Sequence, residues 1–278
     1  MPVDYEAEYN CRARVPEYEE IFARWSREAE DYRAEALKAR RAELGLSYGS
    51  SPRQTIDLFL PRPDVTAPLA LFVHGGYWRS LEPAMFSQMA RGINAHGVAV
   101  AVAGYDLCPQ VTIKEIIDQI RHACLFLWLR TGQRMIAYGH SAGGHLAATL
   151  LATEWHELYP KAPPDLVHAA YSVAAIFDLT PLVHTSMAVD LCLDEASARE
   201  VSPIFWPAPQ GRSFDAVAGS SETNEFRRQS RAITEQWGKH GARTRHEERP
   251  GNHFTVVDAL SDPGSAMTER VAELAHSI

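Results

Sequence analysis

The sequence predicts an α/β fold in which a mostly parallel central sheet carries helices on both faces. Short apolar runs alternate along the chain with segments whose apolar residues recur every three or four positions, which is the pattern of βαβ units. The chain has 278 residues, of which 46% are hydrophobic and 22% charged, and these values are typical of a globular domain with a full core. A helical extension at the N-terminus is expected to precede this domain.

Residues 1–50 are predicted to form that N-terminal helical extension, and residues 51–278 the main α/β domain. From Pro16 to Leu44 the chain is rich in Glu, Arg and Ala, and one stripe of residues keeps helical spacing, so we expect one long amphipathic helix. The stripe consists of Tyr18, Phe22, Trp25, Ala29, Tyr32 and Ala36. We expect the stripe to pack on the main domain, with a lid over a site or a contact with a second subunit as the alternative.

Within the main domain, apolar runs predict strands, and helically spaced segments predict the helices between them. The predicted strands are Thr55–Leu60, Leu69–His74, Val98–Ala103, Met135–Tyr138, Ala169–Val173, Asp215–Ala218 and Thr244–Glu248. The predicted helices lie near Met85–Ala95, Ile113–Leu127, Gly143–Thr153 and Phe226–Lys239. Residues 178–209 are irregular and interrupted by prolines, which predicts an insertion that covers a site.

Charge and composition exclude several classes of function. The 27 Lys and Arg against 35 Asp and Glu give a net charge of −8, which is the wrong sign for a protein that binds nucleic acid or anionic lipid. The cysteines Cys11, Cys108, Cys124 and Cys192 form no C-x-x-C pair, so reduced thiols and a cytoplasmic location are expected. The acidic segment Met1–Asn10 lacks the pattern of an export signal, and the longest apolar runs are too short to cross a membrane.

The strongest motif is Gly139-His140-Ser141-Ala142-Gly143, which follows one predicted strand and opens a predicted helix. Strand, turn and helix are the context of a G-x-S-x-G nucleophile elbow, in which the serine is held in strained backbone geometry. Glycine two positions before and after the serine avoids collisions with the neighbouring strand and helix. Ser141 is therefore the candidate nucleophile, and His140 and His145 are expected to make structural hydrogen bonds.

A serine hydroxyl needs a histidine to take its proton and a carboxylate to orient that histidine. In this type of fold the chain order is nucleophile, acid, histidine. His253 lies on a Gly-containing loop after the last predicted strand and is the candidate base. Glu222, which follows the strand before it, is the candidate acid. Asp178 after the preceding strand is the alternative, and Glu225 is expected to cap a helix.

The segment His74-Gly75-Gly76-Tyr77-Trp78 comes directly after a predicted strand, where this fold places a backbone oxyanion hole. The main-chain N–H groups of Gly75, Gly76, Tyr77 and Ala142 are the candidate donors to the oxygen that becomes negative when a carbonyl is attacked. Tyr77 and Trp78 are also expected to form aromatic walls of a pocket for a short-acyl aryl substrate. A tight turn with core aromatics is the alternative.

Together these segments resemble the α/β-hydrolase esterases and arylformamidases, in particular serine-dependent kynurenine formamidase and its bacterial relatives. The resemblance is carried by His74–Trp78, Gly139–Leu146, Glu222–Phe226 with Gln229-Ser230, and Asn252–Phe254. It implies that Ser141, Glu222 and His253 form a catalytic triad, with the oxyanion loop at His74–Trp78. Members of this family often carry aspartate at the position of Glu222, which is one methylene longer.

We therefore expect a serine hydrolase that cleaves a small, aromatic amide or ester through an acyl-enzyme on Ser141. N-formylkynurenine is the sharpest substrate hypothesis, and a short-chain carboxylesterase is the alternative. A noncatalytic binding protein of this fold is a second alternative, which the presence of all the triad residues disfavours. His140 and His145 lack the spacing of metal ligands on one helix face, so no metal or other cofactor is expected. The sequence leaves a homodimer and the preference for amide or ester open.

Overall fold

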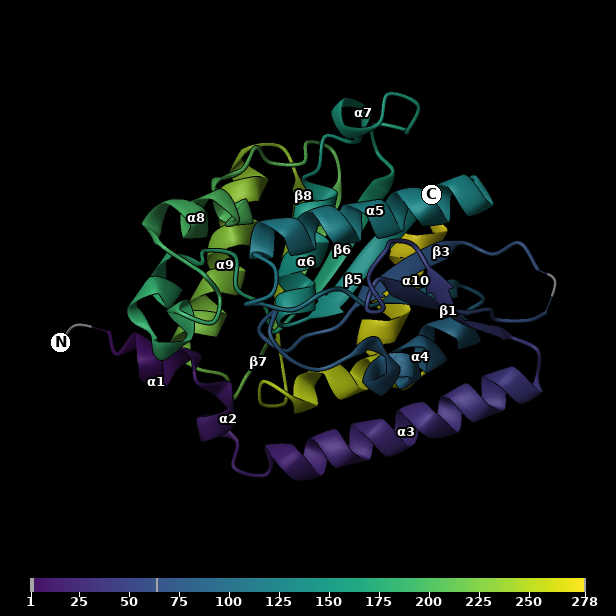
Figure 1. Ribbon diagram of the computed structural model, residues 1–278, viewed down its shortest axis with the longest axis horizontal. Helices are drawn as coiled ribbons and strands as arrows, with labels where there is room; N and C mark the ends of the chain where they lie inside the picture. The colour runs from purple at the N-terminus through teal and green to yellow at the C-terminus, as the bar shows by residue number, and fades with distance from the viewer. Residues whose placement is uncertain (1–2, 64, 278) are drawn as a thin grey trace.

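The computed structural model describes residues 3–63 and 65–277. Residues 1 and 2 of the predicted N-terminal extension, and residues 64 and 278 of the predicted main domain, lie outside the described residues. At its centre is an eight-stranded sheet in the order β1-β2-β4-β3-β5-β6-β7-β8 (Figure 1). The pairs β1–β2 and β2–β4 are antiparallel and the other pairs are parallel, which confirms a mostly parallel sheet. The strands are β1 (Ala42–Ser47), β2 (Thr55–Phe59), β3 (Leu69–Val73), β4 (Ala99–Ala103), β5 (Met135–His140), β6 (Val167–Val173), β7 (Ser213–Gly219) and β8 (Arg243–Arg249).

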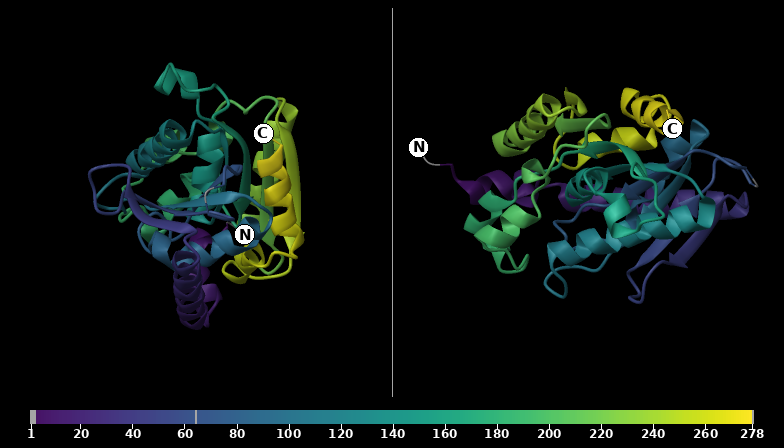
Figure 2. Two further views of the ribbon diagram at one scale, coloured as in Figure 1. Left: turned by 90° about the vertical axis from the view of Figure 1, so that its right-hand side faces the viewer. Right: turned by 90° about the horizontal axis from the view of Figure 1, so that it is seen from above.

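Helices cover both faces of the sheet, as the predicted fold class requires. Figure 2 shows α5 (Ile113–Thr131) and α6 (Ala142–Leu151) on one face and α10 (Ala266–His276) on the opposite face. The other α-helices are α1 (Tyr5–Tyr9), α2 (Cys11–Arg14), α3 (Tyr18–Lys38), α4 (Arg91–Ala95), α7 (Trp155–Leu158), α8 (Glu195–Glu200) and α9 (Asn224–Lys239). The 3₁₀ helices are η1 (Pro83–Ala90), η2 (Thr180–His184), η3 (Ser186–Ala188), η4 (Pro203–Phe205) and η5 (Thr255–Ser261).

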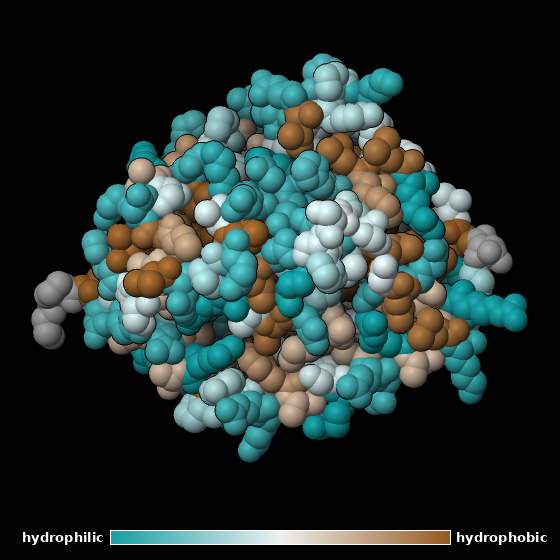
Figure 3. Space-filling model, viewed as in Figure 1, coloured by the Kyte–Doolittle hydropathy of each residue, from teal (hydrophilic) through white to brown (hydrophobic). Residues whose placement is uncertain are grey.

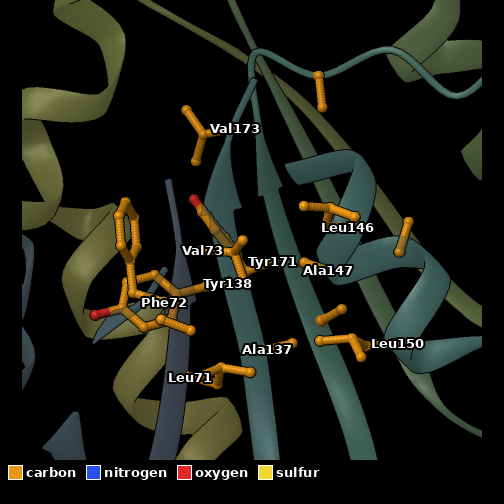
Figure 4. Packing of buried hydrophobic residues seen from close by; sticks show 14 of the residues in the cluster. Leu71, Phe72, Val73, Ala137, Tyr138, Leu146, Ala147, Leu150, Tyr171 and Val173 are labelled. Atoms are coloured by element: carbon orange, nitrogen blue, oxygen red, sulfur yellow. The ribbon is translucent and has the colours of Figure 1, made fainter. Parts of the chain in front are cut away.

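The central strands are buried on both faces because their side chains are mostly apolar. Every residue of β3, β4 and β5 is buried, and a continuous apolar run is what a parallel sheet between two helical layers needs. Figure 4 shows Leu146, Ala147 and Leu150 of α6 beside these strands, and the rings of Phe72 and Tyr138 meet with centroids 5.0 Å apart. This packing fixes the relative positions of the carboxyl ends of the strands.

The N-terminal region differs from the single long helix that the sequence predicts. The helix expected from Pro16 to Leu44 spans only Tyr18–Lys38, and Ala42–Ser47 is the edge strand β1. Arg40 follows the helix with a left-handed φ of 54°. The residues of β1 alternate between half-buried and exposed, a period of two that its helix-favouring Ala, Glu and Leu residues conceal in the sequence. The first 50 residues thus contribute a strand to the main sheet, and the domain division at residue 50 stays a prediction.

Helix α3 lies along the lower edge of the molecule in Figure 1 and packs on η1. Its buried residues are Ile21, Trp25, Ala29, Tyr32 and Ala36, most of which belong to the predicted stripe. Arg24 and the indole N–H of Trp25 both donate to Asp258 at 2.6 Å, and Arg33 forms an ion pair with Asp57 of β2. The expectation that the stripe packs on the main domain is therefore confirmed.

The surface carries both polar and apolar side chains. On the face shown in Figure 3, hydrophobic residues form small patches that hydrophilic residues interrupt. Two of the large exposed apolar side chains, Leu129 on α5 and Val189 between η3 and α8, belong to different elements, and scattered residues of this kind are normal on folded proteins. Across residues 3–63 and 65–277, none of the helices combines the length and the apolar character needed to span a bilayer.

The approach of Gly143 to β3 gives a test of the fold. An ideal Cβ on Gly143 would lie 1.9 Å from the carbonyl oxygen of Val73, and no side-chain rotation relieves a clash with backbone. We expect Gly143→Ala to prevent folding or to lower the free energy of unfolding by about 3 kcal/mol, the upper end of the cost of overpacking. Denaturant unfolding followed by tryptophan fluorescence measures the difference.

Gly264→Ala is the matched control for this substitution. A Cβ on Gly264 would lie 3.6 Å from the nearest atom, on Asp262, so its free energy of unfolding should stay within about 0.5 kcal/mol of the wild-type value. A Gly143→Ala variant as stable as the Gly264→Ala control would contradict the packing described here.

Candidate active site

The turn between β5 and α6 holds Ser141 in a strained backbone conformation. Strand β5 ends at His140, α6 begins at Ala142, and Ser141 between them has φ 55° and ψ −120°. An ideal Cβ on Gly139 would lie 2.4 Å from the carbonyl oxygen of Gly143, so the turn requires glycine there. The Ser141 N–H donates to the carbonyl oxygen of Val173 at 2.8 Å, which ties the turn to the end of β6.

His253 lies beside Ser141 on the loop that follows β8. Its Nε2 is 3.1 Å from the Ser141 Oγ, and its Nδ1 is 2.8 Å from Oε1 of Glu222. The side chains of His253 and Glu222 are only 6% and 1% exposed, so water has little access to either bond. A chain of hydrogen bonds therefore runs from a buried carboxylate through an imidazole to the serine hydroxyl.

Glu222 lies between β7 and α9, and the backbone holds it in place. Its second carboxylate oxygen accepts from the N–H of Gly219 at 2.8 Å. Asp178, the alternative acid, accepts instead from the N–H and the hydroxyl of Thr180, at 3.0 and 2.6 Å. The fold thus brings Glu222 to His253 and engages Asp178 in a local turn.

Opposing effects set the protonation of His253. Burial lowers its pKa, whereas Cys11 and the Glu222 carboxylate together raise it by more, so the pKa lies above the ordinary value of 6.5. The neighbouring His140 differs, because burial, followed by the charge on His253, lowers its pKa to about 3. Its Nε2 lies 2.7 Å from the carbonyl oxygen of His253. His140 therefore stays neutral and positions the backbone of His253.

Two further histidines near the site bind backbone carbonyl groups. Nε2 of His145 is 2.7 Å from the carbonyl oxygen of Val201, and Nδ1 of His74 is 2.7 Å from that of Gly75. Burial lowers the pKa of each to about 4, so both are neutral at physiological pH. The structural hydrogen bonds expected of His140 and His145 are thus confirmed.

The loop after β3 lies against the serine turn. An ideal Cβ on Gly75 would be 3.1 Å from the Cβ of Ser141, and the loop then turns through positive φ values of 116° at Gly76 and 50° at Tyr77. In the part of the chain that the structure describes, the N–H groups of Gly76 and Tyr77 reach no protein acceptor. Ala142 is the first residue of α6, so its N–H has no acceptor within the helix. These N–H groups can donate to a negative oxygen that forms close to Ser141.

A cavity of about 350 Å³ lies over the serine and the histidine, and its walls come from distant parts of the chain. Its aromatic lining consists of Tyr9, Phe22, Trp25, Tyr77 and Phe254, together with the rings of His140 and His253. Ser186, Met187 and Asp190 also line it, so the irregular segment of residues 178–209 borders the site as expected of a covering insertion. The wall of the cavity therefore combines aromatic rings with polar and charged side chains.

Tyr77 lines this cavity, but Trp78 does not, contrary to expectation. Trp78 is fully buried, and its ring meets His145 edge-on with centroids 5.0 Å apart. It therefore supports the loop from behind. The aromatic wall comes instead from Phe22 and Trp25 of α3, which helical spacing alone marked as a packing stripe. A lid over a site was the alternative predicted for this stripe, and the spacing did not show which end of it borders the cavity over Ser141.

Comparison with known proteins places this geometry in a family. Residues 56–197 match the model of the family described as BD-FAE. The chain belongs to the BD-FAE family. Relatives of this BD-FAE protein include the kynurenine formamidases of Salmo salar and Danio rerio, 28% and 27% identical over 83% of this chain and 81% of theirs. A solved structure from Silicibacter sp., a candidate thioesterase, is 32% identical with a TM-score of 0.84, covering 97% of this chain and 99% of that one.

The comparisons also decide the kind of protein. The formamidase relatives and the similar Silicibacter structure make this BD-FAE member a hydrolase of the serine-dependent type, in the arylformamidase and esterase class. More distant solved structures share its fold. The resemblance seen in the sequence is therefore confirmed. None of the comparisons favours the noncatalytic alternative.

The charge on His253 can be measured directly. Because Cys11 and Glu222 raise its pKa, we expect the imidazole of His253 to titrate above pH 6.5, whereas His140 stays neutral throughout. Because the pKa of His253 is higher in the folded protein than in the unfolded chain, its protonation raises the free energy of unfolding. This contribution is fully present below about pH 6.5 and is lost as the pH rises through the folded-state pKa. NMR of the imidazole resonances against pH measures both groups.

Substitution of Glu222 supplies the comparison for this titration. Glu222→Gln removes the carboxylate charge and should lower the pKa of His253. Glu248→Gln, which removes a charge that pairs with Arg227, should leave it unchanged. A wild-type His253 that titrates below pH 6.5 would contradict the predicted direction.

Proposed function

We propose that this BD-FAE hydrolase is an arylformamidase that cleaves N-formylkynurenine through an acyl-enzyme on Ser141. The observation that carries the proposal is the series of hydrogen bonds from Glu222 through His253 to Ser141, at an aromatic-lined cavity of about 350 Å³. Relatives named kynurenine formamidase, which align with 83% of the chain, support this substrate class.

In the first half of the reaction, Ser141 Oγ attacks the formyl carbon while His253 Nε2 accepts the hydroxyl proton. The C–N bond of the tetrahedral intermediate then breaks, and the imidazolium gives that proton to the departing aryl nitrogen. The arylamine leaves, and the formyl group remains as an ester on Ser141. Glu222 orients the imidazole and stabilises its positive charge while the proton resides there.

In the second half, a water molecule attacks the formyl ester as His253 takes one of its protons. The bond to Ser141 Oγ breaks, the oxygen regains that proton, and formate leaves with release of a proton to solvent. The net reaction converts one formamide and one water into an arylamine, formate and a proton. In both halves the N–H groups of residues 75–77 and of Ala142 stabilise the oxyanion, and one such donor contributes about 3–4 kcal/mol in comparable sites.

The cavity suits an aryl group next to a small acyl group. Phe22, Trp25, Tyr77 and Phe254 provide apolar ring surfaces, and aromatic pairing adds about 0.5–1.5 kcal/mol beyond the area buried. Formyl is the smallest acyl group and needs the least space beside Ser141. The ring surfaces thus favour an aryl group on the leaving-group side of a short-acyl substrate.

Hydrolysis of short-chain esters is the second candidate, because the same groups cleave esters and the similar Silicibacter structure is a candidate thioesterase. A panel of p-nitrophenyl esters measured beside N-formylkynurenine and other aryl amides separates the two. A higher kcat/KM for the formamides supports the arylformamidase, and a higher value for the esters replaces it with the carboxylesterase.

We also propose a cytoplasmic location and a small-molecule substrate without a nucleic-acid partner. The net charge of −8 supports this, as do the free thiols of Cys11, Cys108, Cys124 and Cys192. Sedimentation velocity decides whether the chain forms a homodimer.

Removal of the nucleophile is the first test of the mechanism. We expect Ser141→Ala to lower kcat by at least about a thousandfold and to leave the fold intact, because the hydroxyl carries the attack. Labelling with a fluorophosphonate probe should occur in the wild-type protein and not in the variant. Ser220→Ala, at an exposed serine between β7 and Glu222, is the control and should label normally. Full activity in Ser141→Ala would refute the proposal.

Substitution of the acid tests the assignment of Glu222. We expect Glu222→Gln to lower kcat by orders of magnitude, because the amide cannot stabilise the imidazolium, and Glu222→Asp to retain part of the activity. Asp178→Asn is the matched comparison and should have a milder effect, since Asp178 bonds to Thr180 and not to His253. The reverse ranking of kcat values would transfer the role to Asp178.

A further inference from the structure

The charged side chains around the cavity differ in whether they have ionic partners. The carboxylates and guanidinium groups that line it are Glu6, Arg12, Arg79 and Asp190. Arg79 and Asp190 form an ion pair with each other, so their charges largely cancel. Glu6 and Arg12, which both belong to the N-terminal segment α1–α2, are the remaining charges that a bound molecule can meet.

Arg12 keeps its positive charge. Its guanidinium lies 3.4 Å from the Ser80 hydroxyl and sits over the rings of Tyr18 and Phe22, at 5.4 and 5.8 Å from their centroids. Aromatic faces attract a cation without neutralising it. Among the residues that the structure describes, no carboxylate forms an ion pair with Arg12, so the guanidinium donors that face the cavity remain available.

Glu6 keeps its negative charge in the same way. Its carboxylate accepts from the N–H and the hydroxyl of Ser186, at 2.7 and 2.9 Å. Both of these donors are neutral, and within residues 3–63 and 65–277 no cationic side chain forms an ion pair with Glu6. The same cavity therefore presents one carboxylate and one guanidinium that no ion of opposite sign compensates.

The segment that carries these two charges is held firmly against the site. The hydroxyl of Tyr9, which lies between Glu6 and Arg12 in the sequence, donates to Glu225 of α9 at 2.7 Å. The carbonyl oxygen of Tyr9 accepts from the hydroxyl of Tyr77 on the loop after β3, at 2.5 Å. The segment that carries the two charges is therefore anchored beside the site, and a ligand that matches them does not have to order this segment first.

We propose that Arg12 and Glu6 bind the carboxylate and the ammonium group of an α-amino acid that the aryl substrate carries. The inference rests on the proposed function, because it concerns the leaving-group side of the cavity over Ser141. Arginine donates two parallel hydrogen bonds to a carboxylate, and a carboxylate beside neutral donors attracts an ammonium group. The pair selects aryl formamides that carry a zwitterionic amino acid over those without charged groups.

The test uses a set of related formamides of 2-aminophenyl ketones. One carries the full amino acid, as in N-formylkynurenine, one lacks the ammonium group, one lacks the carboxylate, and one lacks both. For each formamide with the carboxylate, kcat/KM is divided by that of the matching formamide without it. We expect Arg12→Met to lower this ratio about tenfold, through a higher KM for the formamide that carries the carboxylate. Charges remote from the reacting carbonyl bind the ground state and the transition state equally, which is why KM changes.

Two further variants complete the comparison. Glu6→Gln should raise KM several-fold for the formamides that carry an ammonium group and leave KM unchanged for those that lack it. Arg14→Met is the matched control, because Arg14 lies on the same short helix, pairs with Glu8 at 3.8 Å and does not line the cavity. It should leave every ratio unchanged. Equal losses for all the formamides in Arg12→Met, or no loss for any, would overturn the proposal.

A binding measurement separates this inference from the proposed function. Calorimetry in the Ser141→Ala background gives Kd for each formamide without turnover, with Arg12 intact or replaced by methionine. If the wild-type protein hydrolyses none of the formamides, the proposed function fails on its own. A tenfold rise in Kd confined to the carboxylate-bearing ligands still supports the role of Arg12, and an unchanged Kd refutes it.

Discussion

The contact of the β5–α6 turn with the end of β3 is the constraint on which the site depends. A Cβ on Gly143 would meet the carbonyl oxygen of Val73 at 1.9 Å, so α6 reaches this position only with glycine there. That approach imposes the strained φ of Ser141 and leaves the N–H of Ala142 at the open end of the helix. It also brings Gly75, on the loop that follows β3, against Ser141. A wider turn would lose all of these features together.

The parallel sheet then gathers the remaining groups at one edge. Strands β5, β6, β7 and β8 are neighbours in that order, so the loops that follow them lie side by side. This is why His253 and Ser141, 112 positions apart, are joined by one hydrogen bond. Burial of the bond to Glu222 and the neutral His140 behind His253 keep the imidazole in one orientation.

The parts of the protein that a local pattern determines were predictable from the sequence. Buried parallel strands are continuous apolar runs, and a glycine-flanked serine between a strand and a helix is typical of a nucleophile elbow. The strand Ala42–Ser47 was missed because an edge strand facing solvent can be built from residues that favour helices. The burial of Trp78 depends on its φ of 54° and on His145, which no spacing reveals. The part of the cavity wall that α1 and α2 supply depends on long-range contacts, such as the hydrogen bond from Tyr9 to Glu225. No local sequence pattern indicates a contact between residues so far apart in the chain.

The contact between Tyr9 and Glu225 also limits when the cavity can form while the chain is being synthesised. Tyr9 leaves the ribosome well before Glu225, to which its hydroxyl donates and which follows 216 positions later. Until α9 has emerged, the α1–α2 segment lacks this anchor and the aromatic cavity lacks one of its walls. The strands up to β7 therefore emerge while the future site is still open to chaperones and solvent, and the cavity can be enclosed only after α9 has followed them.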